Sequence, residues 1–266
     1  MQGAQRLLAL LFSTMCTIAI LLDTVADSPL VLAANRDELY ARPTKPPERS
    51  ASGVVGGIDV LSGGTWLALR RDGRFAAVTN QRALATPLPD LRSRGHVVRE
   101  VVEAADPDAY VRAIEPTHYA SMNLLWGDAR RVSIAYIRQD GSLEIEQLGR
   151  GIHVLCNDRL GADGFPRGER FHAALEPLAG QTFAASLPVI MRALGDHTRV
   201  PLADVPPSHL PPQLGRELTA TCIHSESYGT RSATILALVP DQVLHYLHAD
   251  GPPCTTPFTD RSALLG

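Results

Sequence analysis

Four short polar stretches follow apolar runs of this sequence, and together they hold the groups of a nucleophilic site. They are residues 35–38 (NRDE), 79–80 (TN), 156–157 (CN) and 228–231 (YGTR). Arginine and aspartate at the end of a buried strand must be paired or hydrated, because burying an unpaired charge costs several kcal/mol. A surface turn with an ion pair would explain any one stretch alone. Their combination with a cysteine near the N-terminus favours one shared site.

Cys16 is the candidate nucleophile of such a site. A thiolate is the attacking form, and a neighbouring arginine favours it because free cysteine has a pKa of about 8.5. An N-terminal amine, with a pKa of about 7.7–8.0, is suited to accept the thiol proton. A carboxylate can hold that amine, and asparagine NH₂ groups can stabilise a developing oxyanion. On these grounds we expect Cys16 to be the most reactive of the four thiols.

The stretch LVLAANRDELYARP at residues 30–43 resembles the signature of the NRDE family, also called the transport and Golgi organisation protein 2 family. Members typically open with Met-Cys and a short strand, as residues 15–18 do here. Further similar segments follow in family order at residues 64–67 (GTWL), 76–80 (AAVTN), 123–128 (NLLWGD), 153–157 (HVLCN) and 228–232 (YGTRS). The resemblance covers about residues 16–240.

This resemblance implies the four-layer αββα sandwich of N-terminal-nucleophile hydrolases, of the choloylglycine hydrolase and penicillin V acylase type. The resemblance implies that Cys16 is the nucleophile and that its freed amine is the base. Arg36 would stabilise the thiolate, and Asp37 would position the amine. Asn80 and Asn157 would line the oxyanion hole, and Arg231 would support the site or the substrate. One departure lies beside this set, because Cys156 stands where the family usually has serine.

Residues 1–15 precede the candidate nucleophile and would block its amine. Three interpretations stay open: an over-extended start with synthesis beginning at Met15, a cleaved export signal, and a retained leader. The charge-free run at residues 7–22 is shorter than the roughly 20 residues of a membrane span, so no stable span is expected. We expect residues 16–266 to form a single domain. Four scattered thiols suit the cytoplasm, with export as the alternative if residues 1–15 act in a signal peptide.

The strands and helices that must position these residues are predicted to form an α+β protein. Strands are expected at residues 16–23, 30–35, 65–70, 74–80, 123–126, 132–138, 143–148, 219–224, 232–239 and 243–247. Helices are expected at residues 97–114 with a break near Pro107, 168–178 and 187–194, and a proline-rich surface loop at residues 42–52. A net charge of -3 provides no broad basic surface, so no nucleic-acid partner is expected.

No metal or cofactor is expected from the sequence. His245 and His248 should point to opposite faces of a strand. Cys222 and His224 should share a face, yet no further ligands accompany them in the sequence.

Two functions of different classes remain. The first is a hydrolase or acyltransferase that acts on a linear amide (a non-peptide C–N bond) or a thioester through a Cys16 acyl-enzyme. The second is a non-catalytic binding or trafficking protein on the same fold, since the resemblance includes proteins associated with Golgi organisation, haem handling and acyl-lipid metabolism. The partner is thus a small amide, acyl or haem-like ligand. A secreted protein with disulfides is a third reading, and the oligomeric state stays open.

Expression from Met15 is predicted to yield a soluble protein that begins at Cys16, because the apolar run after Cys16 should form a strand inside the first sheet. Cell fractionation and intact-mass measurement of the shortened and full-length chains check this. Recovery of the shortened chain only as insoluble aggregate, with the full-length chain in the membrane fraction, would contradict it.

Overall fold

Three neighbouring strands of the first sheet are covered on both faces, which requires apolar side chains at successive positions. The computed structural model describes residues 16–81, 91–208 and 210–266, so the expectations for residues 1–15 lie outside the described residues. β1 (Cys16–Val25) and β2 (Ser28–Leu39) are buried along nearly their whole length. β2 pairs antiparallel with β1 on one side and with β11 (Tyr228–Val239), which is buried in the same way, on the other.

Two antiparallel sheets form the centre of the described chain. The first has the order β10-β1-β2-β11-β12-β13, where β10 is Gly151–Leu155, β12 is Gln242–Ala249 and β13 is Thr259–Asp260. The second runs from β3 to β9 in chain order. Its strands are β3 (Thr44–Arg49), β4 (Val55–Asp59), β5 (Leu67–Leu69), β6 (Phe75–Asn80), β7 (Met122–Gly127), β8 (Val132–Ile137) and β9 (Leu143–Gln147).

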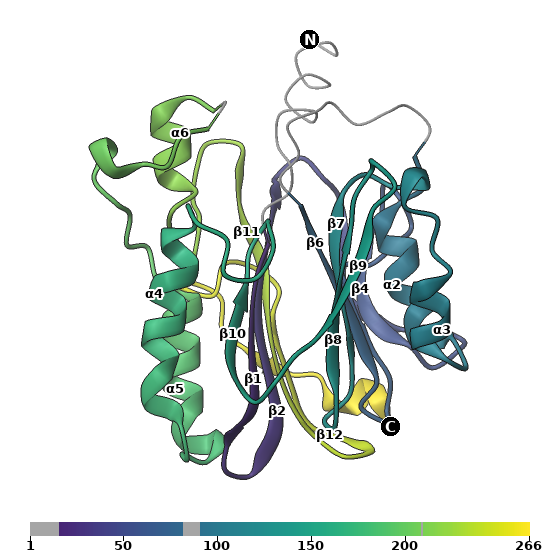
Figure 1. The fold of residues 1–266 in the computed structure, drawn as a ribbon. Helices are drawn as coiled ribbons and strands as arrows, with labels where there is room; N and C mark the ends of the chain where they lie inside the picture. Colours follow the sequence, from purple (N-terminus) through teal and green to yellow (C-terminus); the bar gives the residue numbers. More distant parts are fainter. Residues whose placement is uncertain (1–15, 82–90, 209) are drawn as a thin grey trace.

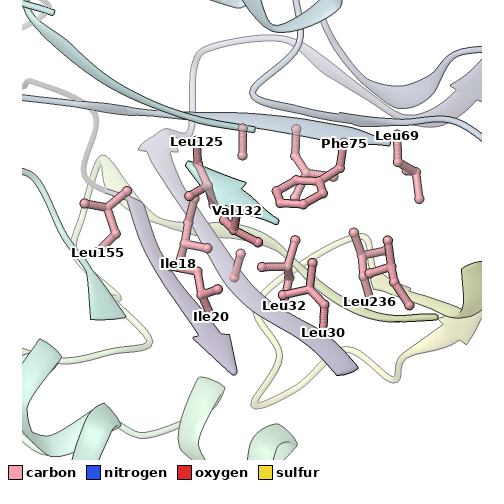
Figure 2. Close-up of a cluster of buried hydrophobic side chains, with 14 of the residues drawn as sticks. Ile18, Ile20, Leu30, Leu32, Leu69, Phe75, Leu125, Val132, Leu155 and Leu236 are labelled. Carbon is pink, nitrogen blue, oxygen red and sulfur yellow. The ribbon is translucent and has the colours of Figure 1, made fainter. Parts of the chain in front are cut away.

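The largest apolar cluster lies between the sheets. Alternate residues of β1 and β2 face the second sheet, because side chains alternate across a strand. Figure 2 shows Ile18, Ile20, Leu30, Leu32 and Leu236 of the first sheet beside Leu69, Phe75, Leu125 and Val132 of the second. This packing holds the two sheets face to face.

Helices cover the outer face of each sheet (Figure 1). On the first sheet, α4 (Pro166–Leu175) and α5 (Phe183–Leu194) pack over the residues of β1, β2 and β11 that face away from the second sheet. On the second, α2 (Arg94–Glu103) and α3 (Pro107–Arg112) cover β6 and β7. Within the described residues, the remaining helix is α6 (Pro212–Glu217), and the short 3₁₀ turns are η1 (Pro116–His118), η2 (Glu176–Leu178), η3 (Leu202–Asp204) and η4 (Ser262–Leu265). The predicted four-layer αββα sandwich is confirmed.

None of the helices in the described part of the chain has the length and apolar character to cross a membrane. The expected helices at residues 97–114, 168–178 and 187–194 correspond to α2 with α3, α4 with η2, and α5.

Two sequence-based expectations were wrong. The proline-rich loop expected at residues 42–52 contains β3, an edge strand. Its two prolines lie where the pairing with β4 shifts register between Lys45 and Glu48, and edge strands with bulges tolerate proline.

The strand expected at residues 219–224 is irregular, with one isolated bridge from His224 to Gly229. Side chains satisfy several of its carbonyl groups, while the Ile223 carbonyl oxygen accepts from the Thr230 backbone N–H of β11 at 2.9 Å. Asn35 donates to the Thr221 carbonyl oxygen at 2.9 Å, and Arg170 donates to the Thr219 carbonyl oxygen.

Leu32→Ala is predicted to lower the free energy of unfolding by about 2–5 kcal/mol, because the change leaves a cavity between the two sheets. Leu32 is 1% exposed, whereas Leu61 is 70% exposed, so Leu61→Ala serves as the control with a change below about 0.5 kcal/mol. Urea unfolding followed by circular dichroism measures both. Equal effects of the two variants would show that this layer does not carry the fold.

Candidate active site

Strand pairing brings the polar ends of the central strands together. Cys16 is the first residue of β1 and pairs with Arg36 of β2, and Arg36 pairs with Ser232 of β11. Asp37 pairs with Thr230 in the same ladder. These residues border a cavity of about 470 Å³ that residues of both sheets line. Five of the six predicted site residues line it: Cys16, Arg36, Asp37, Asn80 and Arg231.

Asp37 is a fully buried carboxyl group, and the structure accounts for the hydrogen bonding of only one of its two oxygens. Its Oδ1 accepts a hydrogen bond of 2.6 Å from the Thr230 hydroxyl, which in turn accepts one from the Ile223 backbone N–H. Its Oδ2 is buried and has no hydrogen-bond partner among the described residues. Burial raises the pKa of Asp37 to about 7, although Arg167, Thr230 and Arg36 oppose the shift. A buried carboxylate oxygen without a donor is costly, so this position suits a cationic or N–H group.

The thiol of Cys16 is neutral in this environment. Burial, with a contribution from the Asp37 charge, raises the pKa of Cys16 to about 12. Arg36 acts on the thiol in the expected direction and lowers its pKa, but it does not offset burial, and Cys16 stays protonated near neutral pH. A reaction at Cys16 needs a base that removes the proton as the bond forms.

Arg36 is buried beside this thiol and is 8% exposed. Its Nη2 lies 3.5 Å from Glu38 Oε2, and Glu38 also lies 3.6 Å from Arg42. The Nη1 atom of Arg36 is buried without a hydrogen-bond partner. The pair with Glu38 offsets the cost of burying the guanidinium, while Nη1 stays available to a ligand oxygen.

Asn157 supports Asn80 from behind the cavity. Its Nδ2 donates to the Asn80 carbonyl oxygen at 2.9 Å, and its Oδ1 accepts from Arg167 Nη2 at 2.7 Å. Asn157 is buried and does not line the cavity, whereas Asn80, the last residue of β6, does. Arg167 is itself buried and also donates to the Leu218 carbonyl oxygen. The network fixes the end of β6 against the first sheet.

Arg231 anchors the turn that follows β2. The pairing of β11 with β2 shifts register between Thr230 and Ser232, which places Arg231 in a bulge. From there its Nη1 donates to the carbonyl oxygens of Leu39, Tyr40 and Arg42. Arg231 thus supports the rim of the cavity, as its predicted role allows.

Sequence reasoning missed Arg94, which opens α2 and lines the cavity. Burial lowers the pKa of Arg94 to about 10, so the side chain stays charged near neutral pH, and it interacts electrostatically with Cys16. Close backbone contact holds α2 here, because a Cβ on Gly64 would lie 2.6 Å from the Gly95 carbonyl carbon. Gly64, the first residue of the Gly-Thr-Trp-Leu segment, therefore allows α2 to pack closely against this segment. No motif around Arg94 in the sequence indicated that Arg94 would line the cavity.

The histidines of β12 lie on opposite faces, as predicted. His245 stacks on Phe183 of α5, whereas His248 is buried, lies 3.0 Å from the Thr234 hydroxyl and lines the cavity. Burial lowers the pKa of His248 to about 4, so this imidazole is neutral near pH 7.

The sequence argument against a site at Cys222 and His224 was that no further ligands accompany them, and the structure corrects it. His197 and Cys254 lie beside them, brought in from distant parts of the chain. None of the four lines the cavity at Cys16.

Comparison with known proteins assigns the family. The sequence pattern described as Transport and Golgi organisation 2 matches residues 15–249. The chain belongs to the transport and Golgi organisation 2 family. The Transport and Golgi organization 2 homolog of Mus musculus is 29% identical over 230 residues, covering 78% of this chain and 81% of the relative. The homolog of Homo sapiens is 28% identical over 235 residues, covering 80% and 83%.

Solved structures confirm the fold of this family member. The chain is similar to the Caenorhabditis elegans ortholog of N-acylethanolamine-hydrolyzing acid amidase, with a TM-score of 0.53 and 14% identity, covering 85% of this chain and 95% of that one. It is also similar to a variant of conjugated bile acid hydrolase from Clostridium perfringens, with a TM-score of 0.54 and 10% identity, covering 94% of each chain. The sandwich is therefore that of the N-terminal-nucleophile hydrolases.

Asp37→Asn is predicted to stabilise the chain that retains the residues before Cys16, and more at pH 8 than at pH 5. A carboxyl with a folded pKa of about 7 is protonated in both states well below pH 4, and its burial cost appears as pH rises to 7. Asparagine lacks that cost, so the gain at pH 8 approaches an upper limit of about 4 kcal/mol. Urea unfolding at the two pH values measures it.

Asp241→Asn is the matched control, because this carboxylate has 73% side-chain exposure and pairs with Arg130 at the surface. Its effect should differ between the two pH values by less than about 1 kcal/mol. A destabilised Asp37→Asn protein at pH 8 would contradict the buried, unpaired state of Asp37.

Proposed function

We propose that this protein is an N-terminal-cysteine hydrolase that cleaves a small amide or thioester through an acyl-enzyme on Cys16. The observation that carries the proposal is the buried Oδ2 of Asp37, which has no donor in the described part of the chain and lies near the first residue of β1. An α-ammonium group on Cys16 would supply that donor and a compensating charge. The proposal therefore requires Cys16 to become the first residue of the working chain.

The first step follows from the neutral thiol. Because burial holds the pKa of Cys16 at about 12, the proton must leave as the sulfur attacks. The free α-amine of the same residue is the base, and Asp37 orients it. The Sγ–C bond forms, the carbonyl π electrons move to oxygen, and the thiol proton passes to the amine. The resulting ammonium is stabilised by the Asp37 carboxylate.

Asn80 is the proposed oxyanion donor, since it ends β6 and lines the cavity. Asn157 contributes by holding the Asn80 backbone in place through its 2.9 Å hydrogen bond. This differs from the role first expected for Asn157, which was direct donation to the oxyanion. Donors fixed before the reaction stabilise the tetrahedral intermediate without reorganisation.

Collapse of the intermediate breaks the C–N or C–S bond, and the ammonium returns its proton to the leaving group. A thioester bond between the acyl group and Cys16 remains. Water then attacks that thioester with the amine again as base, which releases the carboxylic acid and restores the thiol. Transfer to an amine instead of water would make the same site an acyltransferase.

The cavity suggests the class of substrate. Ile58, Trp66 and Val78 provide an apolar wall, while Arg36 and Arg94 place guanidinium groups at the same cavity. A substrate with an apolar acyl portion and an anionic group would satisfy both. We also infer a cytoplasmic location, because all four cysteines are free.

Cys16→Ser is predicted to keep the fold and lose most of the activity found in a screen of acyl amides and thioesters, because a hydroxyl is far less ionised than a thiol. Asn80→Ala should lower kcat by about 10²–10³-fold with little change in KM. Mass spectrometry of the wild-type protein under turnover should find the acyl group on Cys16. The chain used begins at Cys16, as checked by intact mass.

Cys156→Ser is the control for loss of a buried thiol, since serine is the usual residue of the family there, and it should stay active. Turnover by Cys16→Ser at the wild-type rate, without an adduct on Cys16, would refute the nucleophile. Tight binding of a substrate-like ligand without turnover would favour the binding or trafficking protein.

A further inference from the structure

A second cluster of reactive side chains lies away from the cavity at Cys16. His197, Cys222, His224 and Cys254 each offer one ligand atom, and these atoms lie within 4.8 Å of one another. They come from three segments of the chain. His197 follows α5, Cys222 and His224 lie in the irregular stretch before β11, and Cys254 lies in the turn after β12. Cys222 is buried, and the other three are exposed.

Three distances within the cluster match the spacing of ligand atoms around a tetrahedral ion. Sγ of Cys222 lies 3.7 Å from Sγ of Cys254. Nε2 of His224 lies 3.2 Å from Cys254 Sγ and 3.8 Å from Cys222 Sγ. A tetrahedral Zn²⁺ with bonds of about 2.3 Å to sulfur and about 2.0 Å to nitrogen places its ligand atoms about 3.3–3.8 Å apart. A disulfide requires the sulfurs to lie about 2.05 Å apart, so the two thiols are not bonded to each other.

The hydrogen bonds around His197 provide an independent indication. Its Nδ1 lies 2.9 Å from the carbonyl oxygen of Cys222. A carbonyl only accepts, so Nδ1 is the donor in this bond, and Nε2 is the ring nitrogen left for a metal. Such a bond from the second ring nitrogen is the usual outer partner of a metal-binding histidine. The Cys222 backbone N–H also donates to the Asp196 carbonyl oxygen at 2.8 Å, which ties the two segments together.

We propose that His197, Cys222, His224 and Cys254 bind one structural Zn²⁺ ion. Two thiolates, two neutral imidazoles and a divalent cation have no net charge, and this ligand set in tetrahedral geometry is typical of zinc. Binding forms two Zn–S and two Zn–N bonds and releases the two thiol protons to solvent. All four positions come from protein ligands, which is the closed arrangement of structural rather than catalytic zinc.

Zinc at this site would fix residues 219–224, which contact Asp37 through Thr230. Residues on either side of Cys222 contact the central strands, because the Thr221 carbonyl accepts from Asn35 at 2.9 Å and the Ile223 N–H donates to Thr230. Thr230 is the residue that donates to Asp37. This stretch does not belong to either sheet, so a metal that joins it to the segments at residues 197 and 254 would replace the missing strand pairing.

The test is zinc binding by the full chain, with no substrate needed. Protein purified under reductant, stripped with a chelator and titrated with Zn²⁺ should bind one equivalent. Native mass spectrometry should show the mass of one zinc less two protons. Co²⁺ in its place should give the visible absorption of a tetrahedral ion and thiolate charge-transfer bands. Zinc should also slow alkylation of the exposed Cys254.

His197→Ala and Cys254→Ser change exposed residues, so both variants should fold, and each should weaken zinc binding by at least about 100-fold. His118→Ala, at another exposed histidine, and Cys156→Ser are the matched controls and should bind as the wild type does. A metal-free mass in the presence of Zn²⁺ would overturn the proposal. So would equal binding by His197→Ala and Cys254→Ser, or a Cys222–Cys254 disulfide that persists in the purified protein.

Discussion

Antiparallel pairing of β1 with β2 is the interaction on which the rest of the site depends. It places the first residue of β1 opposite Arg36 and next to the backbone of Asp37, in the middle of a sheet that is covered on both faces. The apolar residues that follow Cys16 are locked between the second sheet and the α4–α5 layer. A shift of one residue would turn Cys16 away from the cavity and exchange the side chains that fill the two apolar layers, so the core of the sandwich also sets the position of the thiol.

When Cys16 is not the first residue, the site has no free α-amine to act as the base for the thiol. The thiol is neutral, Asp37 has a pKa raised to about 7, and both shifts arise mainly from burial. An ammonium group between them would lower the pKa of each, because a nearby positive charge favours both anions. Release of the amine would therefore supply a base and at the same time relieve the cost of burying Asp37.

Patterns and motifs in the sequence predicted the layers and five of the residues that line the cavity. Alternating or continuous apolar runs marked the central strands, and the motif order led to Cys16, Arg36, Asp37, Asn80 and Arg231, all of which line one cavity. Local patterns failed where the backbone is satisfied by distant side chains. The stretch at residues 219–224 has the composition of a strand, but the side chains of Asn35 and Arg170 donate hydrogen bonds to two of its carbonyl oxygens.

Contacts between residues that are far apart in the sequence could not be predicted from local patterns either. Arg94 reaches the cavity because two glycines let α2 approach, and His197 joins Cys222 and Cys254 across spacings that match no zinc motif. The burial that raises the pKa of Cys16 likewise depends on both sheets, so the motif around Arg36 gave the direction of the Arg36 effect but not the larger opposing effect of burial.

The most direct measurement is a high-resolution crystal structure of the chain that begins at Cys16. The account predicts that the α-amino nitrogen of Cys16 lies about 2.7–3.0 Å from Oδ2 of Asp37, the oxygen that otherwise has no donor. It also predicts that Thr230 still donates to Oδ1. An amine that points away from Asp37, with Oδ2 bonded to another protein group, would contradict the proposed role of Cys16 as nucleophile and base.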